Sequence, residues 1–335
     1  MSEKKYDVFG VGNALVDVLA QVNDDLVAGF ELPKGSMNLM DSEKQATVLT
    51  GLEQSSLKLA SGGSAANTMV AIAQSGGTGV YIGQVAHDTH GEFYKKDMQD
   101  SGIAFPVEPA PAASLPTGTS VILTTPDAER TMCTHLGIST SLNKSKVDFD
   151  LLSQSSISYI EGYLWDAEDP RAVCVETFEQ SKKRGVKAAF TFSDAFLIDR
   201  FASDFGSLLD EYCDIVFCNA DEARKFFGVE ELAECNKQLA ERVDLAFVTN
   251  GSEGCYVLQN GQIEHVGGYE VTAVDTVGAG DAFAGGVLYG LAHDMPANLA
   301  ARWGNYFASR VVAKIGPRLD GDMQDDLKTV LASVG

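Results

Sequence analysis

The chain has 335 residues, 45% hydrophobic and 21% charged, a composition typical of a globular protein with enough apolar material for a sizeable core. Its 25 Lys and Arg stand against 47 Asp and Glu, giving a formal net charge of −22. Such an acidic surface repels nucleic acid and anionic lipid, so we expect a small-molecule or protein partner, no nucleic acid and no membrane. No apolar run reaches the roughly 20 residues that span a bilayer, and the cysteines form no C-x-x-C pair, which favours a cytoplasmic protein with reduced thiols.

Taken in chain order, the first predicted elements are a strand at "YDVFGVG" (6–12), a helix over 63–76 and a strand at "GVYIGQV" (79–85). From about residue 150, short apolar runs alternate with longer helical patterns, as in "SISYIEGY", "DPRAVCVETFEQSKKRG", "VKAAFTFS", "CDIVFCN" and "LAFVTN". This alternation is typical of βαβ units. We therefore predict one α/β domain over 1–335, with a central, mostly parallel sheet and helices on both faces.

Two segments, at about 15–40 and 103–136, depart from this alternation because they contain period-two stretches and turn residues. The second segment predicts a hairpin that turns at "PDAE" (126–129). Together they indicate a small β appendage, interpreted as a lid over a site at the strand ends. The alternative is an antiparallel extension of the main sheet.

The stretch "DTVGAGDAFAGG" (275–286) places Asp281 after a glycine-rich turn and at the start of a helix that is apolar on nearly every face. The free amides of such a buried helix start, Val277 to Asp281, can form a nest for a phosphoryl group. Asp281 then has two interpretations. It caps the helix, or it is the base that takes the proton of an alcohol attacking that phosphoryl group.

Two further glycine motifs precede strand or helix starts. In "SGGSAAN" (61–67), Gly62 and Gly63 predict a hinge, and Asn67 is either solvated or a ligand for a hydroxyl; Ala66 breaks the G-x-S-x-G pattern of serine hydrolases. In "GVGNALVD" (10–17), Leu15 stands where a dinucleotide fingerprint needs Gly or Ala. What remains there is Asp17, a turn residue or a carboxylate able to accept two sugar hydroxyls.

The segment "CDIVFCNADEARKFFG" (213–228) sets Asn219 at a strand end and Glu222 one turn into the next helix. Asn219 is an ordinary N-cap, or the pair holds a hydrated Mg²⁺. "FVTNGSEGCYV" (247–257) predicts a hairpin whose glycines could also support a nucleotide, although the chain contains no P-loop. His87 and His90 lack a third ligand and are interpreted as loop residues.

These motifs, in this order, resemble the ribokinase-like (PfkB-type) family of carbohydrate and nucleoside kinases over almost the whole chain. "DTVGAGDAFAGG" is similar to the family's C-terminal signature, "GGSAAN" to its N-terminal signature, and N-x-x-E at Asn219 to a third motif. The resemblance implies a ribokinase-like three-layer fold with a β lid and ATP-dependent phosphorylation of a primary hydroxyl. It also implies Asp281 as the base, the amides of Gly278, Ala279 and Gly280 as the anion hole, and Mg²⁺ bound through water near Glu222.

Within the family, "GVGNALVDVLAQV", "PTGTS" and the lid hairpin are most similar to adenosine kinases, which implies a nucleoside acceptor, adenosine first. The pocket positions Met37, Asn38, Leu164, Met132 and Thr134 depart from animal adenosine kinases, so a sugar kinase resembling ribokinase or fructokinase is the alternative. A non-catalytic nucleotide or sugar sensor is the contrasting class, disfavoured because the base and its expected partners are all present.

The resemblance also assigns the remaining site residues. It places Arg130 at the transferring phosphate and a monovalent cation such as K⁺ near Asp275 and "AKIGPRL". It implies contacts to the acceptor from Asp17, Gly62, Gly63, Asn67, Met37, Asn38, Met132 and Phe196, and contacts to ATP from Asn219, Thr249, Gly251 and Gly254. The sequence is compatible with a monomer or a homodimer.

Overall fold

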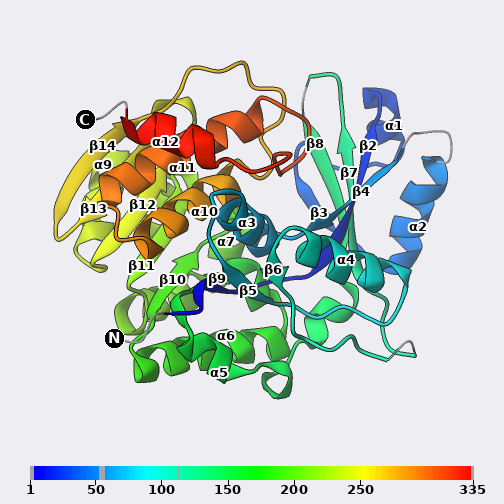
Figure 1. Cartoon of the computed structure of the whole chain (residues 1–335). Helices are drawn as coiled ribbons and strands as arrows, with labels where there is room; N and C mark the ends of the chain where they lie inside the picture. The colour runs from blue at the N-terminus through cyan, green and yellow to red at the C-terminus, as the bar shows by residue number, and fades with distance from the viewer. Residues whose placement is uncertain (1–3, 53–56, 112, 128, 333–335) are drawn as a thin grey trace.

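The computed structural model describes residues 4–52, 57–111, 113–127 and 129–332, and its framework is a nine-stranded sheet (Figure 1). The strand order is β14-β13-β12-β11-β10-β9-β1-β5-β6, parallel from β6 to β12, with β13 and β14 added antiparallel. The strands are β1 (Tyr6–Val11), β5 (Gly79–Ile82), β6 (Ile103–Ala104), β9 (Ser155–Glu161), β10 (Lys187–Thr191), β11 (Ile215–Asn219), β12 (Leu245–Thr249), β13 (Gly254–Gln259) and β14 (Gln262–Gly267). The α/β class and the parallel centre predicted from the sequence are confirmed.

The central strands are apolar at consecutive positions because both faces of the sheet are buried. Val8 contributes to one core and Phe9 to the other, and Ile215 and Val216 are divided in the same way. One face is covered by α5 (Phe149–Ser153), α6 (Glu168–Arg184), α7 (Ala195–Glu211), α8 (Ala220–Phe227) and α9 (Leu232–Ala240). The other is covered by α3 (Ser64–Gln74), α4 (Thr89–Asp100), α10 (Ala279–Ala292) and α11 (Ala297–Val312), with α12 (Gln324–Ala332) packed on α11.

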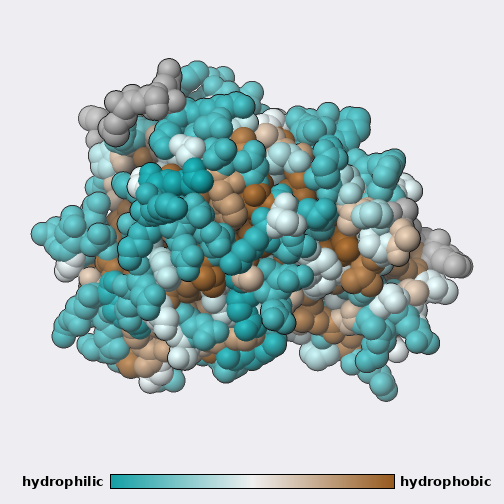
Figure 2. Space-filling model, turned by 90° about the horizontal axis from the view of Figure 1, so that it is seen from below, coloured by the Kyte–Doolittle hydropathy of each residue, from teal (hydrophilic) through white to brown (hydrophobic). Residues whose placement is uncertain are grey.

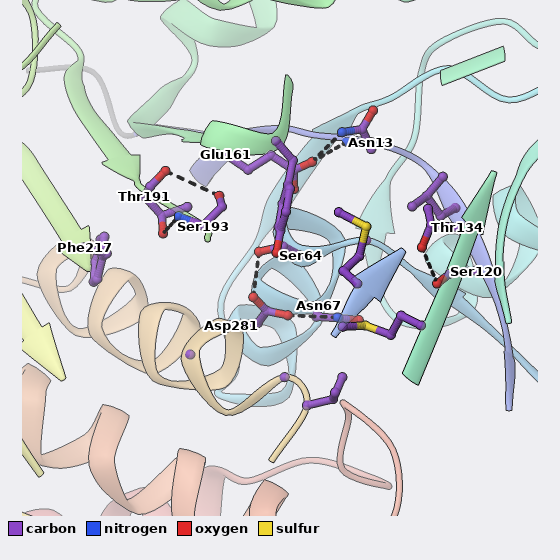
Figure 3. Close-up of a pocket in the computed structure, with 18 of the residues that line it drawn as sticks. Asn13, Ser64, Asn67, Ser120, Thr134, Glu161, Thr191, Ser193, Phe217 and Asp281 are labelled. Carbon is purple, nitrogen blue, oxygen red and sulfur yellow. Dashed lines mark hydrogen bonds between the residues drawn. The ribbon is translucent and has the colours of Figure 1, made fainter. Parts of the chain in front are cut away.

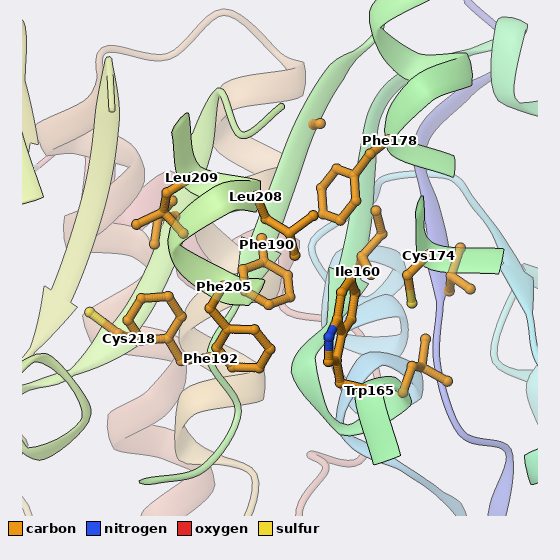
Figure 4. Close-up of a cluster of buried hydrophobic side chains, with 14 of the residues drawn as sticks. Ile160, Trp165, Cys174, Phe178, Phe190, Phe192, Phe205, Leu208, Leu209 and Cys218 are labelled. Carbon is orange, nitrogen blue, oxygen red and sulfur yellow. The ribbon is translucent and has the colours of Figure 1, made fainter. Parts of the chain in front are cut away.

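Aromatic side chains fill the core under α6 and α7 (Figure 4). Phe190 of β10 meets Phe205 of α7 edge to face, with ring centroids 5.0 Å apart. Trp165, in the turn that follows β9, donates its indole N–H to Asp204 at 2.8 Å. This packing fixes the ends of β9 and β10, from which several polar side chains emerge.

A second, five-stranded sheet stands beside the first (Figure 1), in the order β3-β8-β7-β2-β4. Its strands are β2 (Leu15–Gln21), β3 (Met37–Leu39), β4 (Lys58–Gly62), β7 (Gly118–Thr124) and β8 (Arg130–His135). The interpretation of these segments as an extension of the main sheet is therefore wrong. The predicted hairpin is present, because β7 and β8 pair antiparallel with Thr124 opposite Arg130; Ala128 of its turn lies outside the described residues.

The bounds of this second sheet differ from those expected. Strand β4 belongs to it although 58–62 was not included, whereas β6 joins the main sheet. The first segment also contains a short helix, α1 (Asp24–Gly29), which is capped by Asn23. Helix α2 (Ser42–Gly51) and α1 contribute to a small core on one face of the sheet, so the opposite face is left for a site.

Hydrophilic residues cover most of the face in Figure 2, and apolar residues form separate patches between them. In the part of the chain that the structure describes, no helix is long and apolar enough to cross a bilayer. The six cysteines carry no disulfide, and all but Cys213 are buried.

Candidate active site

A cavity of about 330 Å³ lies between the second sheet and the carboxyl ends of the main strands, where open α/β sheets generally bind ligands. One side of the cavity, named the core wall, is formed at the ends of β1, β9, β10, β11 and β12 and by the helix starts beside them. The residues on that wall include Asn13, Tyr159, Glu161, Thr191, Ser193, Asn219, Thr249, Gly280 and Asp281. Figure 3 shows Asn13, Glu161, Thr191, Ser193 and Asp281 of this wall, which come from separate elements.

The facing wall is one face of the second sheet. Four strands each contribute residues two positions apart, as the period of a strand requires. They are Leu15 and Asp17, Met37 and Leu39, Ser120 and Ile122, and Met132 and Thr134. The Ser120 and Thr134 hydroxyls are 2.8 Å apart (Figure 3). This wall, named the lid wall after the role expected from the sequence, is therefore mainly apolar with a short polar strip.

Helix α10 opens its N-terminus onto the core wall. Gly278 precedes it at φ +77°, and a Cβ there would lie 2.6 Å from Pro317, so only glycine fits without strain. The backbone N–H groups of Gly280 and Asp281 have no acceptor among the described residues. A Cβ on Gly280 would meet nothing within 4 Å, so packing does not explain this glycine. The turn leaves donors and free space beside the cavity.

Asp281 is the third residue of α10, and its carboxylate bonds to another helix. It accepts hydrogen bonds from Ser64 Oγ at 2.6 Å and from Asn67 Nδ2 at 2.9 Å (Figure 3). The interpretation of Asp281 as a helix cap is therefore wrong, since Gly278 holds that position. Burial raises the pKa of Asp281, and the two hydrogen bonds and the charge of Arg318 oppose that rise. Asn67 is buried rather than solvated.

Asp17 is the one carboxylate of the lid wall. Its carboxyl group lies only 2.2 Å from the position that a Cβ on Gly62 would occupy. This close approach therefore requires the glycine at the end of β4. Burial raises the pKa of Asp17 to about 7, opposed by the Arg318 charge. Among the described residues no group donates a hydrogen bond to it. The Asp17 carboxyl group can therefore accept hydrogen bonds from a bound molecule.

Glu161, at the end of β9, joins both segments that lead into the second sheet, and the sequence reasoning missed it. It accepts from the Asn13 amide N–H at 2.7 Å and side chain at 3.1 Å, and from the Ala65 N–H at 2.7 Å. Burial raises its pKa to about 7. Gly63 has a φ of +97°, and a Cβ on it would lie 2.1 Å from the Asn13 carbonyl oxygen, so only glycine leaves room for that carbonyl. The signal was a lone acid in the apolar run "YIEGYLW".

Arg318 was also missed, because it lies far along the chain from the groups it contacts. Its Nε donates to Asn67 Oδ1 at 2.8 Å and its Nη1 to Ser61 Oγ at 2.6 Å. It also lies 3.4 Å from a carboxylate oxygen of Asp97. No local pattern in "AKIGPRL" indicates these contacts.

Asn219 and Glu222 form a reciprocal capping box at the start of α8. Asn219 Oδ1 accepts from the Glu222 N–H at 2.8 Å, and Glu222 accepts from the Asn219 N–H at 3.0 Å. Both residues nevertheless line the cavity, as does Thr249. Burial raises the pKa of Glu222 to about 7. The N-cap interpretation is confirmed, and it leaves a carboxylate at the cavity.

Several expected site residues do not line this cavity. Asn38 points away from it because its neighbours Met37 and Leu39 point in, and its amide donates to the Ser36 and Met132 carbonyls. Phe196 packs on Tyr163, which does line the cavity, at 6.2 Å between centroids. The residues expected at the site but absent from the lining are Asn38, Phe196, Gly62, Ala279, Gly251, Gly254 and Arg130.

Three more of these absences, those of Gly251, Gly254 and Arg130, have clear structural reasons. Gly251 and Gly254 turn the chain from β12 into its antiparallel neighbour β13, so the hairpin interpretation is confirmed. Arg130 of β8 is buried in an ion pair with Asp275, which also accepts from the Val277 and Gly316 N–H groups at 2.9 and 2.5 Å. Burial lowers the pKa of Arg130 to about 10, which leaves it charged at neutral pH.

Comparison with known proteins gives a consistent result. The family model "pfkB family carbohydrate kinase" matches residues 36–322. An adenosine kinase from Sinorhizobium meliloti is 34% identical, with a TM-score of 0.91 over 97% of this chain and 99% of that one. A probable sugar kinase from Rhizobium etli CFN 42 is 32% identical, with a TM-score of 0.92 over 97% and 98%.

More distant curated relatives include both acceptor classes. A fructokinase from Klebsiella pneumoniae is 28% identical over 72% of this chain and 80% of its own length. An adenosine kinase from Saccharomyces cerevisiae is 26% identical over 92% and 95%. The chain therefore belongs to the pfkB family of carbohydrate kinases and is an ATP-dependent kinase with the ribokinase-like fold.

Proposed function

We propose that this kinase transfers the γ-phosphoryl group of ATP to the 5′-hydroxyl of a nucleoside, with adenosine as the first candidate. The observation that carries the proposal is the division of the cavity into two walls. A buried carboxylate and free helix amides occupy the core wall, and a broad apolar surface faces them. A nucleoside has a reacting hydroxyl at one end and a flat apolar base at the other, which matches this division.

The chemistry follows from the core wall. Asp281 accepts the proton of the attacking hydroxyl, because its carboxylate lies in the cavity beside the start of α10. The amides of Gly280 and Asp281 donate to the phosphoryl oxygens as their charge develops. Asn67 and Ser64 hold the carboxylate in place. When both substrates are bound, Arg130 leaves its ion pair with Asp275 and binds the phosphate instead.

The acceptor's sugar ring is assigned to Asp17. Two neighbouring hydroxyls can each donate to one of its oxygens, which satisfies a buried group that receives no hydrogen bond from the residues the structure describes. Met37, Met132 and Ile122 then face the base from the lid wall. Closure of this wall about the Asn13 and Gly63 segments excludes water from the transfer.

The ATP side of the site is assigned to Asn219, Glu222 and Thr249. In the described residues no group of three acidic, histidine or cysteine side chains can cage a metal ion. One buried carboxylate beside a cavity does fit a hydrated Mg²⁺, which takes few protein ligands and keeps its waters. When bound with ATP, the ion would neutralise phosphate charge. A K⁺ site is assigned to the neighbourhood of Asp275 and "AKIGPRL" (313–319), two segments that meet where the Gly316 N–H donates to Asp275 at 2.5 Å.

A sugar kinase is the second candidate. Asn13, Asp17 and Glu161 place three polar side chains on one side of the cavity, a set that also suits the hydroxyls of a free sugar. The fructokinase relatives favour this candidate as well. It leaves the apolar lid wall without a role.

The test is ATP consumption with Mg²⁺ and K⁺ against adenosine, inosine, guanosine, cytidine, ribose, fructose and 2-keto-3-deoxygluconate. We expect the highest kcat/KM with adenosine. Preference for a free sugar would contradict the nucleoside assignment and retain the mechanism. Absence of turnover with every acceptor, in protein shown to bind ATP, would favour a non-catalytic sensor. Omitting K⁺ or replacing it with tetramethylammonium tests the monovalent site.

A further inference from the structure

A hydrogen-bond chain runs from the C-terminal loop to the side chain of Asp281. Arg318 Nε donates to Asn67 Oδ1 at 2.8 Å, and Asn67 Nδ2 donates to Asp281 Oδ2 at 2.9 Å. The three groups come from the loop after α11, from α3 and from α10. Figure 3 shows the Asn67–Asp281 end of this chain.

The direction of the Asn67 amide matters because its two ends are chemically opposite. Its NH₂ group stabilises a carboxylate, whereas its carbonyl would repel one. Arg318 removes this ambiguity, since a guanidinium has donors and no acceptor and can face only the carbonyl end. We propose that Arg318 is a positioning residue of the base: it orients Asn67 so that the amide N–H donates to Asp281. This inference rests on the proposed role of Asp281.

Arg318 is itself held from the opposite side. Its Nη1 donates to Ser61 Oγ at 2.6 Å, and Ser61 Oγ donates to Asp97 of α4 at 2.5 Å. The side chain is 12% exposed, so water does not compete freely for these donors. Ser61 precedes Gly62 and Gly63, where β4 leaves the second sheet. The guanidinium thus connects the base to the segment on which the lid wall turns.

The charge of Arg318 stabilises the ionised form of Asp281, as does the hydrogen bond from Asn67 that Arg318 orients. The charged and ionisable groups coupled to Asp281 are Arg318 and four groups whose pKa values the Asp281 charge raises, namely Asp17, Glu161, Tyr159 and Tyr163. Arg318 is the charged group that lowers the pKa of Asp281, together with the hydrogen bonds from Ser64 and Asn67 and against the rise caused by burial. Removing it raises that pKa, so the base is protonated at a higher pH and the acid limb of kcat moves upward.

The experiment compares Arg318→Met, Arg318→Lys and the control Arg310→Met, which removes an exposed arginine of α11. Loss of one charge-assisted hydrogen bond predicts a fall in kcat of about 10- to 100-fold for Arg318→Met, with the KM for ATP little changed. The acid limb of kcat should move to higher pH in Arg318→Met and stay near its original position in Arg318→Lys. In an Asn67→Leu background, Arg318→Met should cost a clearly smaller factor, because the two residues act in series.

A readout independent of turnover completes the test. In protein labelled with ¹³C at the aspartate carboxyls, the resonance missing from Asp281→Asn reports Asp281. We expect its titration to move to higher pH in Arg318→Met and to be unchanged in Arg310→Met. An unmoved titration and an unmoved acid limb would overturn the inference. A moved titration in a protein that phosphorylates no acceptor would support the position of Arg318 and contradict the proposed function instead.

Discussion

The two walls of the cavity are built on different principles. The core wall gathers single polar groups from the ends of five parallel strands and from the starts of α3, α8 and α10, and hydrogen bonds fix Asp281, Glu161 and Asn219 among them. The lid wall presents alternate residues of one sheet face, and most of them are apolar. The first arrangement suits a chemical step common to a whole family, and the second suits recognition of one acceptor. Substitutions should therefore affect kcat on one wall and KM on the other.

Asp281→Asn is the strongest test of the core wall. Removing the base should lower kcat by about 10²- to 10⁴-fold, because the attacking hydroxyl keeps its proton. Folding should be retained, since Asn can still accept from Ser64, and steady-state kinetics with thermal denaturation measure both. A purified variant with the wild-type rate would exclude Asp281 as the base.

Asp17→Asn tests the polar group of the lid wall. Hydrogen bonds to a charged acceptor predict a rise in acceptor KM of about 10- to 100-fold. In the free protein the pKa of Asp17 is about 7. The ionised form accepts from sugar hydroxyls through both oxygens and more strongly than the protonated form does, so the wild-type acceptor KM should fall as pH rises through that value.

The control for this prediction is the variant itself, whose acceptor KM should lose this pH dependence.

The raised pKa of Asp17 also affects stability, because the folded wild-type protein binds the proton of Asp17 more tightly than the unfolded chain does. Its free energy of unfolding should therefore fall as pH rises from about 4 to 7, and Asp17→Asn should reduce that fall. Denaturant titrations at several pH values measure the unfolding free energy of both proteins. An equal change of this free energy with pH in the wild type and in Asp17→Asn would contradict this account.

Gly280→Ala separates catalysis from stability. Its Cβ meets no protein atom, and alanine is the better helix residue, so the unfolding free energy should rise by about 0.5–1 kcal/mol. The same methyl group enters the space assigned to phosphate and should lower kcat/KM about tenfold. Gly278→Ala is the matched variant and should destabilise, because of its φ of +77° and the contact with Pro317. An active, stabilised Gly280→Ala would show that no phosphate approaches this turn.

Met132→Ala addresses the apolar part of the lid wall and should have the smallest effect. Loss of part of a buried contact predicts an adenosine KM about 3- to 10-fold higher with kcat nearly unchanged. Asn38→Ala, on the neighbouring strand but facing away from the cavity, is the control and should leave both constants unchanged. If Asn38→Ala had the larger effect, the orientation of this sheet toward the acceptor would be wrong.

The sequence predicted best what is local. Alternating patterns located the central strands, and "DTVGAGDAFAGG" located the helix start with Asp281, because period and glycine spacing are properties of short segments. Arg318 and Glu161 were missed because their partners lie far away in the sequence. Asn38 was placed on the wrong side because a residue shift of one reverses the face of a strand. The core wall was thus largely predictable, and its supporting contacts were not.

The most direct test of the account is a competition in one vessel. Wild-type protein receives equimolar adenosine and fructose with limiting ATP and Mg²⁺, and ³¹P NMR identifies the phosphate ester that forms. The account predicts adenosine 5′-monophosphate in an amount equal to the ADP released, with little fructose phosphate. A predominance of fructose phosphate, or ADP and inorganic phosphate without any ester, would contradict it.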